Sequence, residues 1–245
     1  MATTDRNKLN FLYAQWAPGT PLTSQDLAAR SISADLAVHY VRAGWLSRLA
    51  RGVYCRPGDT LQLHPSLILL QRAVEGLHVG GKSALDWYGV RHYLSQQPVL
   101  HLYGWTAARI PEWFTERFPA EYHRKRIFDE LPADPLYAGP LEKRGGAPRV
   151  SEPERALLEV FSEVGVRQPI QEARELAESA YSLRADVLRD LLMRCSNVKT
   201  VRLCLQFGRE LSLPWAAKLD PAQLPTGSAR AWVSHSADGR LVLKP

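Results

Sequence analysis

The sequence predicts an α+β fold: an N-terminal winged helix-turn-helix, followed by a larger mixed α/β domain with a C-terminal helical block and a terminal β-hairpin. The first observation is the stretch 20–56, in which two short amphipathic helices lead into a basic hairpin. The second is the remainder, in which a few strand-like runs precede several helical ones. Because 245 residues are enough for two domains, we place the domains at 1–58 and 61–245.

The helix-turn-helix follows a short helix that we expect at Leu9–Trp16. Its first helix is predicted at Ser24–Arg30, with Ser24 or Thr23 as the N-cap, and its second runs from a Ser33 cap to about Ala43. Gly44 ends that second helix, because glycine adopts positive φ without strain. Helical spacing turns Ala37, Tyr40, Val41 and Leu36 inward, and turns Asp35, Val38, His39 and Arg42 outward.

The wing is the β-hairpin predicted from Trp45 to Tyr54, with a basic tip at Ser47–Arg51. In a helix-turn-helix the outer face of the second helix enters the major groove, and basic wing residues contact phosphates. Arg30 and Arg56 lie nearby in the sequence and add positive charge. The predicted contacts to double-stranded DNA are Ser33, Asp35, Val38, His39, Arg42, Arg48 and Arg51. A winged helix used as a protein-binding module is the alternative.

The second domain is predicted from a series of shorter patterns. After a linker at Asp59–Leu63 we expect helices at Ser66–Glu75 and Lys82–Tyr88, strands at Val99–Tyr103 and Tyr122–Phe128, a helical turn at Pro111–Arg117, and loops with a short strand near Leu136. A capping box at Ser151–Glu154 then opens a helix that buries Ala156, Leu157, Val160 and Phe161, and helices follow at 170–180, 183–194 and 198–207. Val187, Leu188, Leu191, Leu192 and Cys195 are expected in the core, and a hairpin turning at Asp238-Gly239 ends the chain.

Two basic or glycine-rich motifs invite a functional interpretation. Gly76–Ser83 reads GLHVGGKS and matches the phosphate-binding loop of nucleotide-hydrolysing enzymes. The residues before it, LILLQRAVE, have helical rather than strand spacing, and no apolar strand ending in Asp follows, so we favour a plain turn into a helix. The second motif is the basic triplet Arg124-Lys125-Arg126. Edge strands often carry such charge to prevent pairing with other strands, so we favour a charged edge strand over a phosphate site or a docking patch.

Composition restricts the class of protein further. The net charge of +6 favours an anionic partner. The N-terminus has no signal-peptide pattern and no apolar run is long enough for a membrane helix, so we expect a cytoplasmic protein. Three cysteines without CxxC spacing and seven histidines without HExxH spacing give no metal site and no disulfide framework. We see no catalytic motif, and expect no cofactor and no enzymatic activity.

The segment GWLSRLARGVY, Gly44–Tyr54, resembles the N-terminal winged domain of AbiEi antitoxins of type IV toxin-antitoxin systems. Two later segments are similar to the same family: SALDWYGV at Ser83–Val90, and SEPERALLEVF at Ser151–Phe161, in which Pro follows Ser by two positions instead of one. The resemblance covers most of the chain, and the wing motif is its most specific part.

The resemblance implies an antitoxin encoded in a two-gene operon. Its N-terminal domain would bind inverted repeats in its own promoter and repress transcription. Its C-terminal domain, here 61–245, would neutralise a toxin of the nucleotidyltransferase fold, without requiring a stable complex. Two alternatives stay open: a transcription regulator whose second domain senses a small ligand, and a P-loop nucleotide-binding enzyme.

Overall fold

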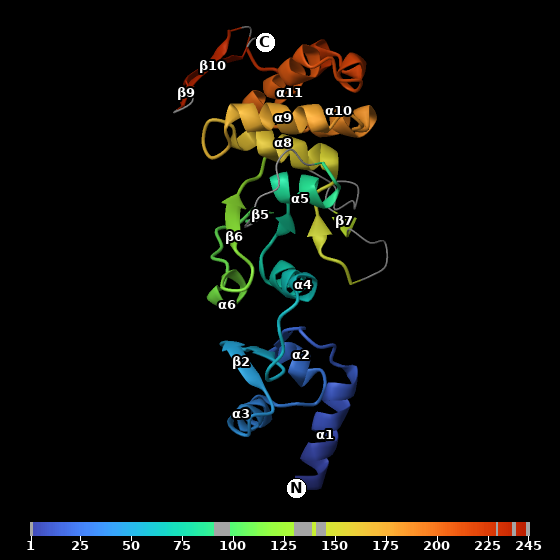
Figure 1. Ribbon diagram of the computed structural model, residues 1–245, viewed down its shortest axis with the longest axis vertical. Coiled ribbons are helices and arrows are strands. Elements are labelled where there is room, and N and C mark those ends of the chain that lie inside the picture. Colours follow the sequence, from blue (N-terminus) through green and yellow to red (C-terminus); the bar gives the residue numbers. More distant parts are fainter. Residues whose placement is uncertain are drawn as a thin grey trace.

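The computed structural model describes residues 2–90, 99–129, 139–140, 146–228, 230–236 and 239–243. Figure 1 shows an elongated molecule with the winged module at the N-terminal end, a small sheet in the middle and a stack of helices at the C-terminal end. The α+β class and the order of its parts are those that the sequence predicts. The short strand expected near Leu136 lies outside the described residues.

The winged module contains three helices and a three-stranded antiparallel sheet in the order β1-β3-β2. Its elements are α1 (Ala2–Gln15), β1 (Leu22–Thr23), α2 (Ser24–Ala28), α3 (Ala34–Arg42), β2 (Ser47–Ala50) and β3 (Val53–Cys55). Helix α1 begins seven residues earlier than the apolar spacing indicates, and the sequence did not predict β1. With only two residues, β1 is too short for period-two alternation to be visible.

Local hydrogen bonds explain where the two central helices begin. Thr23 caps α2 reciprocally: its hydroxyl accepts from the Asp26 amide at 3.1 Å, and its own amide donates to the Asp26 carboxylate at 2.8 Å. The Ser33 hydroxyl accepts from the Leu36 amide at 3.3 Å at the start of α3. Gly44, with φ of 75°, ends α3 as predicted.

The module has a hydrophobic core of its own. Its buried members come from all three helices and from the strands: Leu12, Trp16, Leu22, Leu27, Ile32, Ala37, Tyr40, Leu46 and Tyr54. This cluster is separate from the larger one that fills the rest of the molecule. The predicted linker is nevertheless tied to the module, because the Gly19 amide donates to Asp59 and the Gln62 amide donates to the Gly19 carbonyl. The boundary at 58–61 stays a prediction.

The middle of the molecule is a five-stranded sheet in the order β6-β5-β4-β8-β7. Its elements are α4 (Leu63–Ala73), β4 (His78–Val79), α5 (Gly81–Trp87), β5 (Leu100–Gly104), α6 (Glu112–Thr115), β6 (Ala120–Arg124), β7 (Gly139–Pro140) and β8 (Arg149–Val150). The pairs β5·β6 and β4·β8 are parallel, and the other two are antiparallel.

The predicted strand Tyr122–Phe128 is displaced in the structure. Strand β6 begins at Ala120 and ends at Arg124, because its five residues pair in register with Leu100–Gly104 and β5 ends there. Lys125 and Arg126 therefore follow the strand. Of the basic triplet, only Arg124 lies on an edge strand as we expected.

Four helices form the C-terminal block: α8 (Pro153–Glu163), α9 (Ile170–Ser179), α10 (Ala185–Met193) and α11 (Val198–Glu210). Every residue of α8 after Pro153 is buried, since α5, α9, α10 and α11 all pack against it. The predicted core positions of these helices are buried except Val187, which is half-buried. The terminal hairpin pairs β9 (Trp232–Ser236) with β10 (Gly239–Leu243); Asp238, in its expected turn, lies outside the described residues.

The capping box predicted at Ser151–Glu154 is wrong. The N-cap of α8 is Glu152, whose side chain makes no capping hydrogen bond. The Ser151 hydroxyl instead donates to the Glu159 carboxylate, and Glu154 accepts from the amide and guanidinium of Arg184. Ser151 and Glu154, which local spacing assigned to the cap, both bind tertiary partners instead.

No helix in the described part of the chain is long and apolar enough to cross a membrane.

Two adjacent residues of α1 test the separate core of the winged module. Leu12 is fully buried, whereas Phe11 is 57% exposed. Leu12→Ala should lower the free energy of unfolding of this module by about 2–5 kcal/mol, because it leaves a cavity. Phe11→Ala, the matched control, should change it by no more than about 0.5 kcal/mol. Urea unfolding followed by tryptophan fluorescence measures both, and equal losses would contradict the assigned faces.

Candidate functional site

The outer face of α3 is the first candidate site. Asp35, Val38, His39 and Arg42 are exposed there, and Ala37 and Tyr40 are buried on the opposite face. Ser33 at the cap, Arg48 in β2 and Arg51 at the wing tip are exposed as well. Figure 1 shows α3 and β2 on the same side of the winged module. The structure thus leaves all the predicted contact residues accessible.

Trp45 also belongs to this surface, although the sequence analysis assigned it only to the hairpin. Its ring is 39% exposed and lies edge-on to His39, with centroids 6.2 Å apart. The Tyr13 hydroxyl donates to the Trp45 carbonyl at 2.6 Å, which holds this turn against α1. The aromatic residue directly after the helix-ending glycine was the available signal. His39 is therefore partly fixed by packing as well as presented to solvent.

Two arginines counted toward the basic surface have internal partners. Arg30 donates to the Asp26 carbonyl at 2.7 Å, and Arg56 donates to the Tyr13 carbonyl at 2.6 Å while its guanidinium lies over the Tyr13 ring. These contacts hold helices in place. Their charges still belong to the module, but they have less freedom to reach a phosphate than Arg42 or Arg51.

One side of the wing packs on the larger part of the molecule. Leu49, Ala50 and Val53 are half-buried against the main hydrophobic cluster. Arg48 is exposed, and the pairing of β2 with β3 shifts register between Arg48 and Ala50, where Leu49 and Ala50 pack inward. Arg72 of α4 also forms an ion pair with Asp26, with 3.2 Å between Nη1 and Oδ1. The wing is thus held by the rest of the chain as well as by its own sheet.

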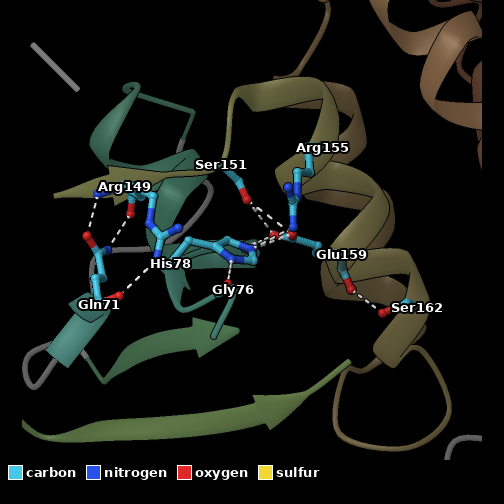
Figure 2. Close-up of polar contacts among 9 residues, drawn as sticks. Gln71, Gly76, His78, Arg149, Ser151, Arg155, Glu159 and Ser162 are labelled. Carbon is cyan, nitrogen blue, oxygen red and sulfur yellow. Dashed lines mark hydrogen bonds and ion pairs between the residues drawn. The ribbon is translucent and has the colours of Figure 1, made fainter. Parts of the chain in front are cut away.

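The second candidate site is a buried polar centre at the glycine-rich motif, shown in Figure 2. The Glu159 carboxylate of α8 accepts from three groups, Arg155 Nε at 2.7 Å, the Ser151 hydroxyl at 2.9 Å and the Gly81 amide at 3.0 Å, and His78 Nε2 lies 2.8 Å from it. His78 Nδ1 lies 2.6 Å from the Gly76 carbonyl. Both Glu159 and His78 are buried.

Electrostatics in this centre favour an ionised Glu159. Burial alone would raise the pKa of Glu159, but His78, Arg155 and their hydrogen bonds lower it to about 2. Burial, and then the charge of Arg155, lower the pKa of His78. The two shifts oppose each other, because a neutral His78 attracts the carboxylate less than a charged one and so lowers the pKa of Glu159 less. The ionised carboxylate still stands, because the donors from Arg155, Gly81 and Ser151 do not depend on the charge of His78.

The resemblance of this motif to a phosphate-binding loop has a structural explanation. A helix, α4, precedes it and another, α5, begins at Gly81, as the spacing predicts. The Gly81 amide donates to Glu159, and Lys82 Nζ lies 3.0 Å from Glu172 Oε1. A Cβ on Gly80 would lie 2.3 Å from Glu159 Oε2. The glycines let the protein's own carboxylate approach the backbone where an enzyme of that class holds a phosphate.

A third group lies on β5 and β6. His101 Nδ1 is 3.0 Å from His123 Nε2, and Glu121 Oε2 is 4.0 Å from His123 Nε2. Burial, then the neighbouring His101 and Arg167, lower the pKa of His123 to about 4, and burial followed by Lys82 lowers that of His101. Sequence reasoning treated these histidines as scattered, because strand register was needed to bring them together.

Beside the polar centre is a cavity of about 150 Å³ lined by Trp105, Arg126, Phe128, Arg155 and other residues. The Arg126 guanidinium lies 5.6 Å from the Trp105 ring centroid, and Lys125 forms an ion pair with Glu163 at 3.3 Å. Two members of the basic triplet therefore lie at this cavity, with partners inside the protein.

Two family models match consecutive parts of the chain. One, described as the N-terminal domain of a transcriptional regulator and AbiEi antitoxin, covers residues 5–96. The other, described as a transcriptional regulator and AbiEi antitoxin of a type IV toxin-antitoxin system, covers residues 97–244. The chain belongs to the AbiEi antitoxin family. The resemblance noted from Gly44–Tyr54 is thereby confirmed, and the two models meet at residues 96 and 97, beyond α5.

The fold of this AbiEi antitoxin is similar to that of a solved structure. The crystal structure of the RV2827C protein from Mycobacterium tuberculosis matches with a TM-score of 0.55, over 94% of this chain and 89% of that chain. The two sequences are 18% identical, so the likeness concerns the fold. None of the curated proteins matches the sequence. The family description is that of a regulator and antitoxin and names no enzymatic reaction.

The buried carboxylate predicts a pH-dependent stability. Glu159→Gln should lower the free energy of unfolding by about 3–5 kcal/mol at pH 7, because it removes the negative charge that the buried Arg155 and His78 surround. Because the pKa of Glu159 is lowered on folding, its contribution is present above the ordinary value near 4.5 and is lost as pH falls toward about 2. The wild-type protein should therefore lose this stability over that window, and the variant should not.

Urea unfolding from pH 7 down to pH 2 measures this effect. Glu178→Gln, at an exposed position of α9, is the matched control and should follow the wild-type curve. A Glu159→Gln protein with wild-type stability at pH 7 would show that the polar centre contributes no net stability.

Proposed function

We propose that this AbiEi antitoxin binds operator DNA in its own promoter through α3 and the wing, and represses its operon. The observation that carries the proposal is the outer face of α3, which presents Asp35, Val38, His39 and Arg42 to solvent from a helix anchored by Tyr40. A recognition helix needs such a rigid scaffold with free polar side chains on the other side. The family description, a transcriptional regulator, agrees with this use.

The distribution of charge supports an anionic partner at this end. Residues 1–58 contain seven Lys or Arg and three Asp, a net charge of +4 out of +6 for the whole chain. The N-terminal quarter thus carries most of the excess positive charge. Phosphate contacts supply most of the sequence-independent affinity for DNA, and Arg48 and Arg51 are the wing residues available for them.

We further propose that the larger part of the chain, 61–245, neutralises a partner toxin of the nucleotidyltransferase fold. Support comes from the family description as an antitoxin of a type IV system. The larger hydrophobic cluster, which includes Leu157 and Leu191, gives this part its own core. A plain regulator with a ligand-sensing second domain would share the DNA-binding end but would not protect cells from a toxin.

Two arginines should separate phosphate contact from base recognition. Arg51→Ala should weaken binding to every duplex and reduce the slope of log affinity against log salt by about one, as for one lost phosphate contact. Arg42→Ala should instead reduce the preference for the operator over other sequences, by about 1–3 kcal/mol for a lost base contact. Fluorescence anisotropy with the upstream region of the gene, at several salt concentrations, measures both.

The matched control is Arg189→Ala, which removes the same charge from an exposed position of α10. Figure 1 places α10 at the opposite end of the molecule from α3. This variant should bind DNA like the wild type. If the wild-type protein does not bind its upstream region even at low salt, the winged module is not a DNA-binding domain.

The two proposed activities should be separable in the full chain. An Arg42→Ala, Arg51→Ala double variant should lose promoter repression but still rescue growth when the neighbouring nucleotidyltransferase-like toxin is expressed. The full chain is preferable to a truncation, because Leu49, Ala50 and Val53 pack on the larger core. A reporter gene and a growth assay in the same strain measure the two outputs. Loss of rescue by a folded double variant would refute the division of labour.

A further inference from the structure

We propose that His101, Glu121 and His123 form a binding site for a divalent transition-metal ion of the zinc type. The proposal is independent of the DNA-binding and antitoxin functions above. Two imidazoles and one carboxylate are a common ligand set for zinc and for other first-row metals. In the described part of the chain, each of the three offers one ligand atom, and all these atoms lie within 4.8 Å of one another.

Strand register creates this arrangement. His101 of β5 is paired with Glu121 of β6, and His123 is two residues further along β6. Side chains two residues apart in a strand share a face, so all three donors project from the same side of the sheet. His123 is fixed further by the Tyr103 ring, which stacks on it with centroids 4.7 Å apart. The histidine positions are therefore set by the backbone and by packing.

The distances suit a metal ion after small adjustments. Zinc holds nitrogen ligands at about 2.0–2.1 Å, so two such ligands in a tetrahedral site are roughly 3.3 Å apart. His101 Nδ1 and His123 Nε2 are separated by 3.0 Å, and Glu121 Oε2 must approach from 4.0 Å. Glu121 is exposed and can make this movement. A cavity of about 30 Å³ between these residues leaves room for a water ligand.

The buried carboxylate of Glu163 gives a second, independent argument for a metal. Its Oε1 atom is buried and has no hydrogen bond in the described structure, although it forms an ion pair with Lys125. It lies 3.8 Å from His123 Nδ1. A histidine that binds metal through Nε2 carries its proton on Nδ1 and usually donates it to a carboxylate or carbonyl. Glu163 is placed to accept that proton.

Without metal the histidine pair has a different protonation pattern. Arg167 Nη1 lies 3.3 Å from His123 Nδ1 and can only donate, so Nδ1 accepts and the proton of the ring lies on Nε2, toward His101. Metal binding removes the Nε2 proton and moves the tautomer to Nδ1. Arg167 is exposed and can withdraw into solvent, and Nδ1–H then turns to Glu163. Glu163 Oε1, which has no hydrogen bond without the ion, then gains a donor.

The test uses the full chain without a histidine tag, freed of metal by a chelator and titrated with zinc by calorimetry. We expect one zinc ion per chain. His101→Ala and His123→Ala should weaken zinc binding by at least about 100-fold, because each removes a ligand. Glu163→Gln should weaken it by about 10–100-fold, as expected for a residue that orients a ligating histidine.

Two further variants keep the test decisive. Glu121→Gln alters an exposed side chain, so it should fold normally and still bind zinc at least about tenfold more weakly. His64→Ala, at an exposed histidine outside the cluster, should bind zinc like the wild type. Cobalt should give the visible spectrum of a tetrahedral site in the wild type and lose it in the ligand variants. No zinc binding by the wild type, or unchanged binding by folded His101→Ala and Glu121→Gln, would overturn the proposal.

Discussion

The buried carboxylate of Glu159 is the constraint on which the larger part of the structure depends. It joins β4 through His78, the start of α5 through the Gly81 amide, and the segment before α8 through Ser151. A charge removed from water is tolerated only when its partners and hydrogen bonds are nearly complete. The sheet, α5 and α8 must therefore be assembled together, since each supplies a donor that the carboxylate requires.

The same constraint explains why the sequence imitates a nucleotide-binding motif. An anion near a backbone amide needs glycines that leave room for it, whether the anion is a phosphate or a side chain. Here the space next to Gly80 is filled by the Glu159 carboxylate and the Tyr103 ring. The motif GLHVGGKS therefore shows only that the backbone leaves room for an anion. The motif does not show which anion is bound; here it is the side chain of Glu159, which lies 78 positions after Gly81.

The parts of the fold that the sequence predicts are those governed by local rules. Helical spacing assigned the buried Tyr40 and the exposed Arg42 of α3 correctly, and Gly44 marked its end. Interpretations that required distant partners were wrong or incomplete: Ser151 and Glu154 have tertiary partners instead of a cap, and the strand expected at Tyr122–Phe128 begins at Ala120 because β5 sets its length. The polar groups around Glu159 and His123 were missed for the same reason, since the packing of α8 assembles the first and strand register assembles the second.

The winged module also shows that a local motif does not act alone. Apolar side chains dominate the contact between the winged module and the larger core, because the one ion pair described there, Arg72–Asp26, has an exposed arginine and contributes at most about 1 kcal/mol. Leu49 and Ala50 lie in the same strand as Arg48. The position of the basic side of the wing relative to α3 is therefore fixed partly by packing on the larger core. A DNA-binding surface built this way would depend on the packing of α4 and its neighbours as well as on the residues that touch DNA.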